Sequence, residues 1–230
     1  MDLAAPGVDI LVAGFDETGE GWFFADGTSF SAPMVSAATA WVWTARPELD
    51  HTQVFNLVRY SARDVWDPGW DDDTGFGVLD IPAALAQTPP IHDQLEPNDD
   101  VFEVKANGLF KDATTPLTSP TRRSNRLIAL LDLTEDPVDV YRAYVPGKGT
   151  LKLRLVPNAD VDLQVFGPGT KTVYGRKGLV ATSANDGTAT ETLVIQNPAR
   201  RGVYVYVTAY LPKGGPLDAG YTLSFKTTAR

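Results

Sequence analysis

Hydrophobic and polar positions divide this chain into two parts with different periods. In the first part, residues 8–15 alternate as a strand does, and residues 34–45 are almost all small or apolar up to the stop at Arg46-Pro47. A helix that is apolar on every side is typical of a central, buried position. The pattern therefore predicts a short strand and then a buried helix over residues 34–45.

A second helix is predicted directly after Asp50, which forms a capping-box-like pair with Gln53. Four positions at helical spacing predict its buried face: Val54, Leu57, Val58 and Ser61. Residues 74–87 then indicate a glycine-rich turn, a short strand and a closing alanine-rich helix. The first part is thus predicted to mix strands and helices, as an α/β segment does.

The second part consists of alternating, β-branched or aromatic runs, separated by turn clusters such as PGKG, GPGT, NDGT and PKGG. Seven runs have this character: residues 126–133, 138–145, 150–156, 161–166, 191–196, 202–211 and 221–226. Seven or eight short strands with such turns predict an all-β antiparallel sandwich.

A proline-rich stretch separates the two parts. Three prolines between residues 89 and 97 cannot donate backbone hydrogen bonds, and they disfavour helix. The expected organisation is a first domain segment over residues 1–87, a linker over 88–95 and the β-sandwich over 96–230.

The composition permits a substantial core and excludes several classes of protein. Hydrophobic residues make up 43% of the 230, and the absence of cysteine excludes disulfides and thiolate metal sites. No apolar run approaches the roughly 20 residues that a membrane-spanning helix needs, so no membrane span is expected. Met1 does not begin a basic-then-apolar signal peptide.

The charge is unevenly distributed. Residues 1–93 hold 15 acidic side chains against three arginines, whereas the remainder holds 14 acidic and 17 basic side chains. A first part this acidic repels phosphate backbones, so nucleic acid is not expected as a partner. Solubility alone also accounts for such an excess of acidic side chains.

The stretch GTSFSAP, residues 27–33, concentrates small hydroxyl residues ahead of the apolar helix. A nucleophilic serine needs open access, N–H donors for the developing oxyanion, and a base. Gly27 permits close approach of a substrate, and Ser29 lies at a helix start where N–H groups are unpaired. Pro33 removes the N–H that would bond the Ser29 carbonyl. The alternative is that Thr28, Ser29 and Ser31 only cap the helix.

This stretch resembles the nucleophile motif of subtilisin-like serine proteases (subtilases). Three further segments agree: DLAAPG at 2–7, RPELDHTQV at 46–54 and TGFGVLDIPAAL at 74–85. The resemblance covers residues 1 to about 86 and implies the C-terminal piece of a parallel-sheet catalytic domain. It also implies that the family's acyl-enzyme chemistry acts on polypeptide substrates and requires no cofactor.

By this resemblance Ser29 is the catalytic nucleophile, and its backbone N–H is one oxyanion donor. Gly27, Thr28 and Pro33 shape the turn. The subtilase order along the chain is Asp, then His, then Ser. The two histidines, His51 and His92, both follow the serine.

The catalytic Asp and His, and the oxyanion asparagine, are therefore expected in a missing N-terminal half of the catalytic domain. The 230-residue chain alone is expected to be inactive. An α/β-hydrolase places its His after the nucleophile, but its G-x-S-x-G elbow needs glycine where Ser31 stands.

The second part resembles the pre-peptidase C-terminal domain over residues 93–227. Four short motifs carry the likeness: EPND at 96–99, DPVDVY at 136–141, DVDL at 160–163 and YTLSF at 221–225. The resemblance implies a non-catalytic domain that assists export or substrate attachment, and a secreted location. The alternative function is a non-catalytic binding or secretion-assisting β-sandwich module that carries a vestigial protease segment.

Hard oxygen ligands gather in the same motifs and indicate a candidate calcium site. The candidates are Glu96, Asn98, Asp99, Asp100, Asp136 and Asp139. The alternative is that Asp136 and Asp139 bond a turn while residues 96–100 are solvated. Tyr204 and Tyr206 are expected to be exposed for carbohydrate or protein binding, or else buried by strand alternation.

Overall fold

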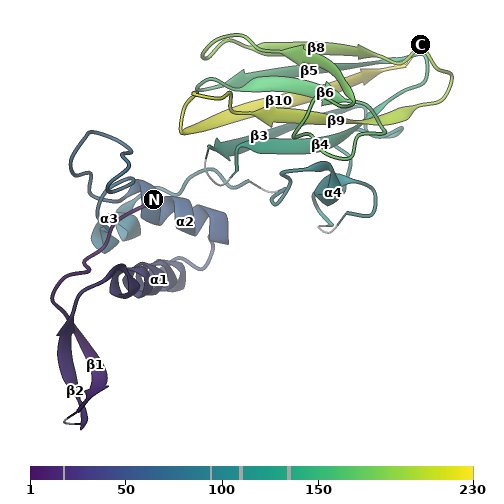
Figure 1. The fold of residues 1–230 in the computed structure, drawn as a ribbon. Coiled ribbons are helices and arrows are strands. Elements are labelled where there is room, and N and C mark those ends of the chain that lie inside the picture. Colours follow the sequence, from purple (N-terminus) through teal and green to yellow (C-terminus); the bar gives the residue numbers. More distant parts are fainter. Residues whose placement is uncertain (18, 94, 109–110, 134–135, 230) are drawn as a thin grey trace. The chain divides into compact units, whose positions relative to one another are not determined.

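The computed structural model describes residues 1–17, 19–93, 95–108, 111–133 and 136–229. The chain folds into two compact units, Met1–His92 and Asp93–Arg230, each coloured along the sequence in Figure 1. None of the helices in the described part of the chain is both long and apolar enough to cross a membrane.

The first unit begins with a β-hairpin. Strand β1 (Ile10–Asp16) pairs antiparallel with β2 (Gly19–Ala25), with Ile10 opposite Ala25. The alternation of residues 8–15 predicts β1 but not β2, whose sequence GEGWFFA does not alternate cleanly. Four large apolar side chains of the hairpin are exposed: Leu11, Phe15, Trp22 and Phe24.

Three helices follow the hairpin: α1 (Thr28–Ala45), α2 (His51–Tyr60) and α3 (Ile81–Ala86). Helix α1 begins six residues earlier than predicted and includes Pro33, but it ends at Ala45 as expected. The predicted capping box of Asp50 and Gln53 is confirmed at the start of α2.

The expectation that α1 is buried all round is wrong. Only Ala38 and Val42 are buried, whereas Trp41 is 59% exposed and Trp43 44% exposed. The reason is that α2 and α3 pack on one face of α1, and the small shared core holds six buried residues. These residues are Val42, Leu49, Val54, Leu57, Val58 and Ala84. Beside the hairpin, a parallel bridge joins Ala4 to Val78.

The second unit is an antiparallel β-sandwich, as predicted. One sheet has the order β3-β10-β5-β8 and the other β4-β9-β6-β7. The strands are β3 (Ser124–Asp132), β4 (Val138–Val145), β5 (Thr150–Pro157), β6 (Asp162–Phe166), β7 (Leu179–Ser183), β8 (Glu191–Gln196), β9 (Val203–Tyr210) and β10 (Asp218–Thr228). Each of the seven strands predicted in the second part overlaps an observed one, and β7 is the eighth. The short strand predicted within residues 74–87 is not formed, because Val78 makes only isolated bridges to Ala4 and Arg63.

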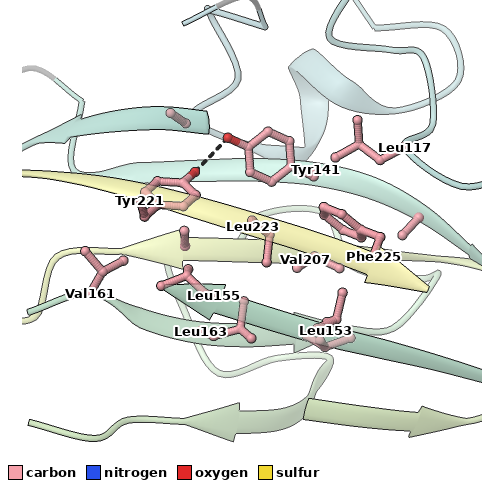
Figure 2. Packing of buried hydrophobic residues seen from close by; sticks show 14 of the residues in the cluster. Leu117, Tyr141, Leu153, Leu155, Val161, Leu163, Val207, Tyr221, Leu223 and Phe225 are labelled. Carbon is pink, nitrogen blue, oxygen red and sulfur yellow. Dashed lines mark hydrogen bonds between the residues drawn. The ribbon is translucent and has the colours of Figure 1, made fainter. Parts of the chain in front are cut away.

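The inner faces of the two sheets form the main core, part of which Figure 2 shows. A second apolar cluster covers the outer face of β4, β9 and β6 with the short helix α4 (Val101–Val104). Tyr206 belongs to that cluster and is only 9% exposed, so the expectation that it lies free for binding is wrong. Tyr204 is 37% exposed, and its ring packs against that of Tyr144 with 5.3 Å between the ring centroids.

Candidate functional site

Ser29 lies at an exposed helix start. It is the second residue of α1, whose N-cap is Gly27, and no side chain caps this helix end. Gly27 has a φ of 150°, which residues with a side chain rarely adopt. The interpretation of Thr28 and Ser29 as helix caps is therefore wrong. The hydroxyl of Ser31 instead donates to the Pro6 carbonyl, at 3.0 Å.

The start of α1 also provides hydrogen-bond donors. The first N–H groups of a helix, among them that of Ser29, have no partner within the helix, and the helix dipole adds positive partial charge there. Pro33 has no N–H, so the Ser29 carbonyl lacks its usual helical partner. An exposed hydroxyl beside such donors suits an attacking oxygen and the oxyanion that its attack creates.

The segment before β1 holds this turn in place. The Gly27 N–H donates to the Gly7 carbonyl at 2.7 Å, next to the bond from Ser31 to Pro6. A Cβ atom on Gly7 would lie 2.6 Å from Ser31 Oγ and 3.2 Å from the Gly27 carbonyl oxygen. Glycine at position 7 is therefore required for the close approach of the two segments. The sequence contains the two segments that meet here, APG at residues 5–7 and GTS at residues 27–29, but no pattern in it predicts that they meet.

The two histidines contact other parts of the first unit. His51 begins α2, is exposed, and meets Phe55 edge-on with 6.4 Å between ring centroids, which agrees with the expected helix-start position. His92 contacts the carboxylate of Asp50 through Nδ1. Neither of these contacts involves Ser29. Among the residues that the structure describes, no hydrogen bond joins the Ser29 hydroxyl to a histidine.

A second concentration of polar chemistry lies at the start of the β-sandwich. Asn98 and Asp139 are completely buried, and Asp100 is 8% exposed. The expectation that residues 96–100 are solvated is therefore wrong. The segment is drawn inward because the Val140 N–H donates to the Asn98 carbonyl at 2.8 Å, which ties it to β4.

Two overlapping groups of carboxylates form this acidic cluster. Asp93, Glu96 and Asp139 make one group, and Glu96, Asp99 and Asp136 make the other. Within each group, one oxygen of every member lies within 4.8 Å of the others. Five carboxylates this close repel one another strongly unless protons or a cation offset the charge.

The hydrogen bonds of the cluster leave several acceptors free. Asn98 Nδ2 donates to Asp139 Oδ1 at 2.8 Å, so the amide oxygen of Asn98 points elsewhere. That oxygen and one oxygen each of Glu96, Asp99 and Asp136 are buried without a donor in the described part of the chain. A buried unpaired acceptor costs about 1–3 kcal/mol. Four free acceptors together match a cation better than any single donor.

Burial and mutual repulsion raise the pKa values of these acids. Burial, followed by the charge of Asp93, raises the pKa of Glu96 to about 7. Burial and the charge of Glu96 raise the pKa of Asp136 to about 10. Burial and the charge of Asp136 raise the pKa of Asp139 well above its usual value. Without a cation, the cluster must therefore retain protons at neutral pH.

These residues fit a calcium ion. Ca²⁺ takes six to eight oxygen ligands, whereas Mg²⁺ needs a tighter octahedron and keeps several waters. Four of the six expected candidates belong to the cluster, and a fifth, Asn98, is hydrogen-bonded to it. Asp100 lies apart from both groups, because its carboxylate accepts the N–H groups of Val101 at 2.7 Å and Val173 at 2.9 Å. Sequence reasoning missed Asp93, which precedes Glu96 by three residues in what was taken as the linker.

Residues 1–77 match the subtilase family (peptidase S8). Fervidolysin of Fervidobacterium pennivorans is 32% identical over 183 residues, which are 73% of this chain and 24% of that protein. Mycosin-5 of Mycobacterium tuberculosis is 33% identical over 99 residues, which are 39% of this chain and 17% of that protein. The fervidolysin alignment is longer than the first unit, so it extends into the sandwich.

Two solved structures are similar in part. The crystal structure of fervidolysin covers 84% of this chain and 39% of its own, with 16% identity and a TM-score of 0.38. The pre-peptidase C-terminal domain of a collagenase from Bacillus anthracis covers 46% of this chain and 90% of its own, with 11% identity and a TM-score of 0.32.

The first unit therefore contains a segment similar to the subtilisin-like serine proteases. That segment, residues 1–77, is followed by an all-β antiparallel sandwich in the second unit. The chain spans about a quarter or less of the length of the relatives it matches.

Proposed function

We propose that Ser29 is the nucleophile of a secreted serine endopeptidase to which these 230 residues contribute. The observation that carries this proposal is the exposed position of Ser29, second in an uncapped helix behind Gly27, within the segment that matches the subtilase family. The substrates are polypeptides. Gly27, Thr28 and Pro33 shape the turn that presents the hydroxyl.

The proposed chemistry proceeds through an acyl-enzyme. A base removes the proton of Ser29 Oγ, the oxygen attacks the peptide carbonyl, and the new oxyanion accepts the Ser29 N–H. The base then donates this proton to the leaving amine as the peptide C–N bond breaks. Water hydrolyses the resulting ester and releases the acyl group. Because His51 and His92 have other contacts in this structure, the proposal assigns the base and its aspartate to residues outside this chain.

The test is labelling of the serine by a fluorophosphonate probe. The 230-residue chain is expected to show no labelling above its Ser29→Ala variant, because a serine lacking its base is a weak nucleophile. The same chain, extended upstream by the sequence that its gene encodes in frame, is expected to be labelled at Ser29. In subtilisin, loss of a triad member lowers kcat by about 10⁴- to 10⁶-fold.

The matched control is Ser36→Ala, since the Ser36 hydroxyl lies exposed on the same helix and donates to the Ala32 carbonyl. This variant is expected to keep the labelling of the extended protein. An extended protein that is not labelled contradicts the proposal. That result favours a non-catalytic, secretion-assisting sandwich module with a vestigial protease segment.

We further propose that the acidic cluster binds Ca²⁺ and stabilises the sandwich. The free oxygens of Glu96, Asn98, Asp99 and Asp136 support this, since all four are acceptors and none has a donor among the described residues. Asp93 and Asp139 complete the ligand set. The bound ion would offset the charge of five neighbouring carboxylates.

Terbium luminescence provides a direct test of this site. Tb³⁺ replaces Ca²⁺ at oxygen sites and emits when a nearby tyrosine is excited, and Tyr221 contacts the Asp139 carboxylate. We expect tyrosine-sensitised emission that excess Ca²⁺ displaces and Mg²⁺ displaces far less well. Emission that Ca²⁺ does not displace, or no emission, contradicts the calcium site.

A further inference from the structure

Asp139 lies where the acidic cluster meets the apolar core. The residue belongs to β4, and its carboxylate is fully buried. Oδ1 accepts from Asn98 Nδ2 at 2.8 Å, on the cluster side. Oδ2 accepts from the hydroxyl of Tyr221. Each carboxylate oxygen thus has one protein donor and keeps a lone pair for another partner.

Tyr221 reaches Asp139 from the opposite sheet. It lies on β10, whose neighbours are β3 and β5, whereas β4 pairs with β9. Its hydroxyl is also 2.7 Å from that of Tyr141, and Figure 2 shows the two rings meeting at this bond. Both tyrosines are 2% exposed, and Tyr141 packs edge-on against Phe225. Apolar packing therefore fixes both rings.

The direction of the hydrogen bonds follows from the proton count. A tyrosine hydroxyl has one proton, and the Asp139 carboxylate can only accept when it is ionised, as a bound cation would make it. Tyr221 therefore donates to Asp139 and accepts from Tyr141. Burial, followed by the charge of Asp139, raises the pKa of both hydroxyls well above the usual value, so both remain donors at all physiological pH values.

We propose that Tyr221 is a positioning residue for the cation site, because its hydroxyl fixes the rotation of the Asp139 carboxylate toward the cluster. The inference rests on the proposed calcium site. A carboxylate on a short side chain can still turn, and a second-layer hydrogen bond that holds it lowers the cost of ordering a ligand. Removal of such partners typically weakens metal binding by about 10- to 100-fold.

A merely structural role makes a different prediction. If the hydroxyl of Tyr221 only joins the two sheets, its loss lowers the stability of the sandwich equally with and without calcium. Calcium affinity then stays unchanged. The affinity, rather than the melting temperature alone, therefore separates the two roles.

The experiment is calorimetric titration of Ca²⁺ into the 230-residue chain and its Tyr221→Phe variant. The variant is expected to bind calcium about 10- to 100-fold more weakly, with the number of ions unchanged. The matched control is Tyr206→Phe, which removes the hydroxyl of a buried tyrosine in the other apolar cluster of the same unit. That control is expected to keep the affinity of the parent chain.

Tyr141→Phe supplies a second variant, since it removes only the outer bond and leaves Tyr221 in place. Tyr141→Phe is expected to weaken calcium binding less than Tyr221→Phe does. If Tyr221→Phe does not fold, the calcium affinity of Tyr141→Phe tests the positioning role instead. Unchanged affinity in the folded Tyr221→Phe variant overturns the positioning role while the calcium site stands. If the parent chain itself binds no Ca²⁺, the site and the inference fail together.

Discussion

Saturating Ca²⁺ is expected to raise the melting temperature of the sandwich unit by about 10 °C relative to the chain in EDTA. A ligand that binds only the folded state adds about 2.7 kcal/mol at a concentration 100 times its Kd. The physical source is the acidic cluster, where burial and repulsion raise the pKa values of Glu96, Asp136 and Asp139. The measurement is tyrosine circular dichroism against temperature, since seven of the eight tyrosines lie in residues 141–221.

Asp136→Asn tests this prediction further, because its effect on the melting temperature is expected to differ between EDTA and Ca²⁺. In EDTA the variant is expected to melt at the same temperature as the parent or higher, because Asp136 with its raised pKa is protonated without a cation and asparagine is likewise uncharged. With Ca²⁺ it is expected to lose most of the rise, since a ligand charge is missing. The control is Asp186→Asn, an exposed acid of the same unit that belongs to neither ligand group. Superimposed melting curves in EDTA and Ca²⁺ would refute the calcium effect.

The β-sandwich was largely predictable from sequence because its information is local. Period-2 alternation and turn residues mark each strand, as the alternating burial of β5 (Thr150–Pro157) shows. Which strands become neighbours was not predictable. Strand β10 lies between β3 and β5, and such pairings depend on packing between distant segments. Strand β7 was missed because LVATS is short and carries few large apolar residues.

The first unit shows where sequence reasoning fails. The apolar character of α1 correctly predicted a helix but not its burial, because burial depends on what covers the helix. Trp41 and Trp43 stay exposed since α2 and α3 cover only one face. The position of Ser29 at a helix start follows from glycine and hydroxyl chemistry. The hydrogen bond from Ser31 to Pro6 holds this helix start in place. It joins residues that are 25 positions apart, and no periodic pattern in the sequence predicts it.

The acidic cluster could be predicted from the sequence only in part. The EPNDD letters and the two aspartates of residues 136–139 indicated hard oxygen ligands, and the structure brings most of them together. Their burial was not predictable, because charged residues are rarely buried unless paired. The link from Asp139 to Tyr221 crosses between the two sheets, so it becomes visible only once the strand order is known.

Phe225→Ala is expected to destabilise the sandwich by about 3–5 kcal/mol, which is a large fraction of the stability of an ordinary domain. Phe225 is 1% exposed, lies in the main core of Figure 2 and packs edge-on against Tyr141. Its truncation removes buried apolar area and leaves a cavity between the sheets. The expected fall in melting temperature is roughly 10–20 °C, read from tyrosine circular dichroism.

The same variant tests whether the two units unfold independently. All five tryptophans lie in residues 22–70, so tryptophan fluorescence reports the first unit and tyrosine dichroism the second. Because the main core consists only of residues from the second unit, Phe225→Ala is expected to leave the tryptophan transition unchanged. Phe102→Ala, at a 46% exposed position, is the control and is expected to shift neither transition appreciably. If the two signals fall together in Phe225→Ala, the units unfold as one, and the first unit draws stability from the sandwich despite its separate core.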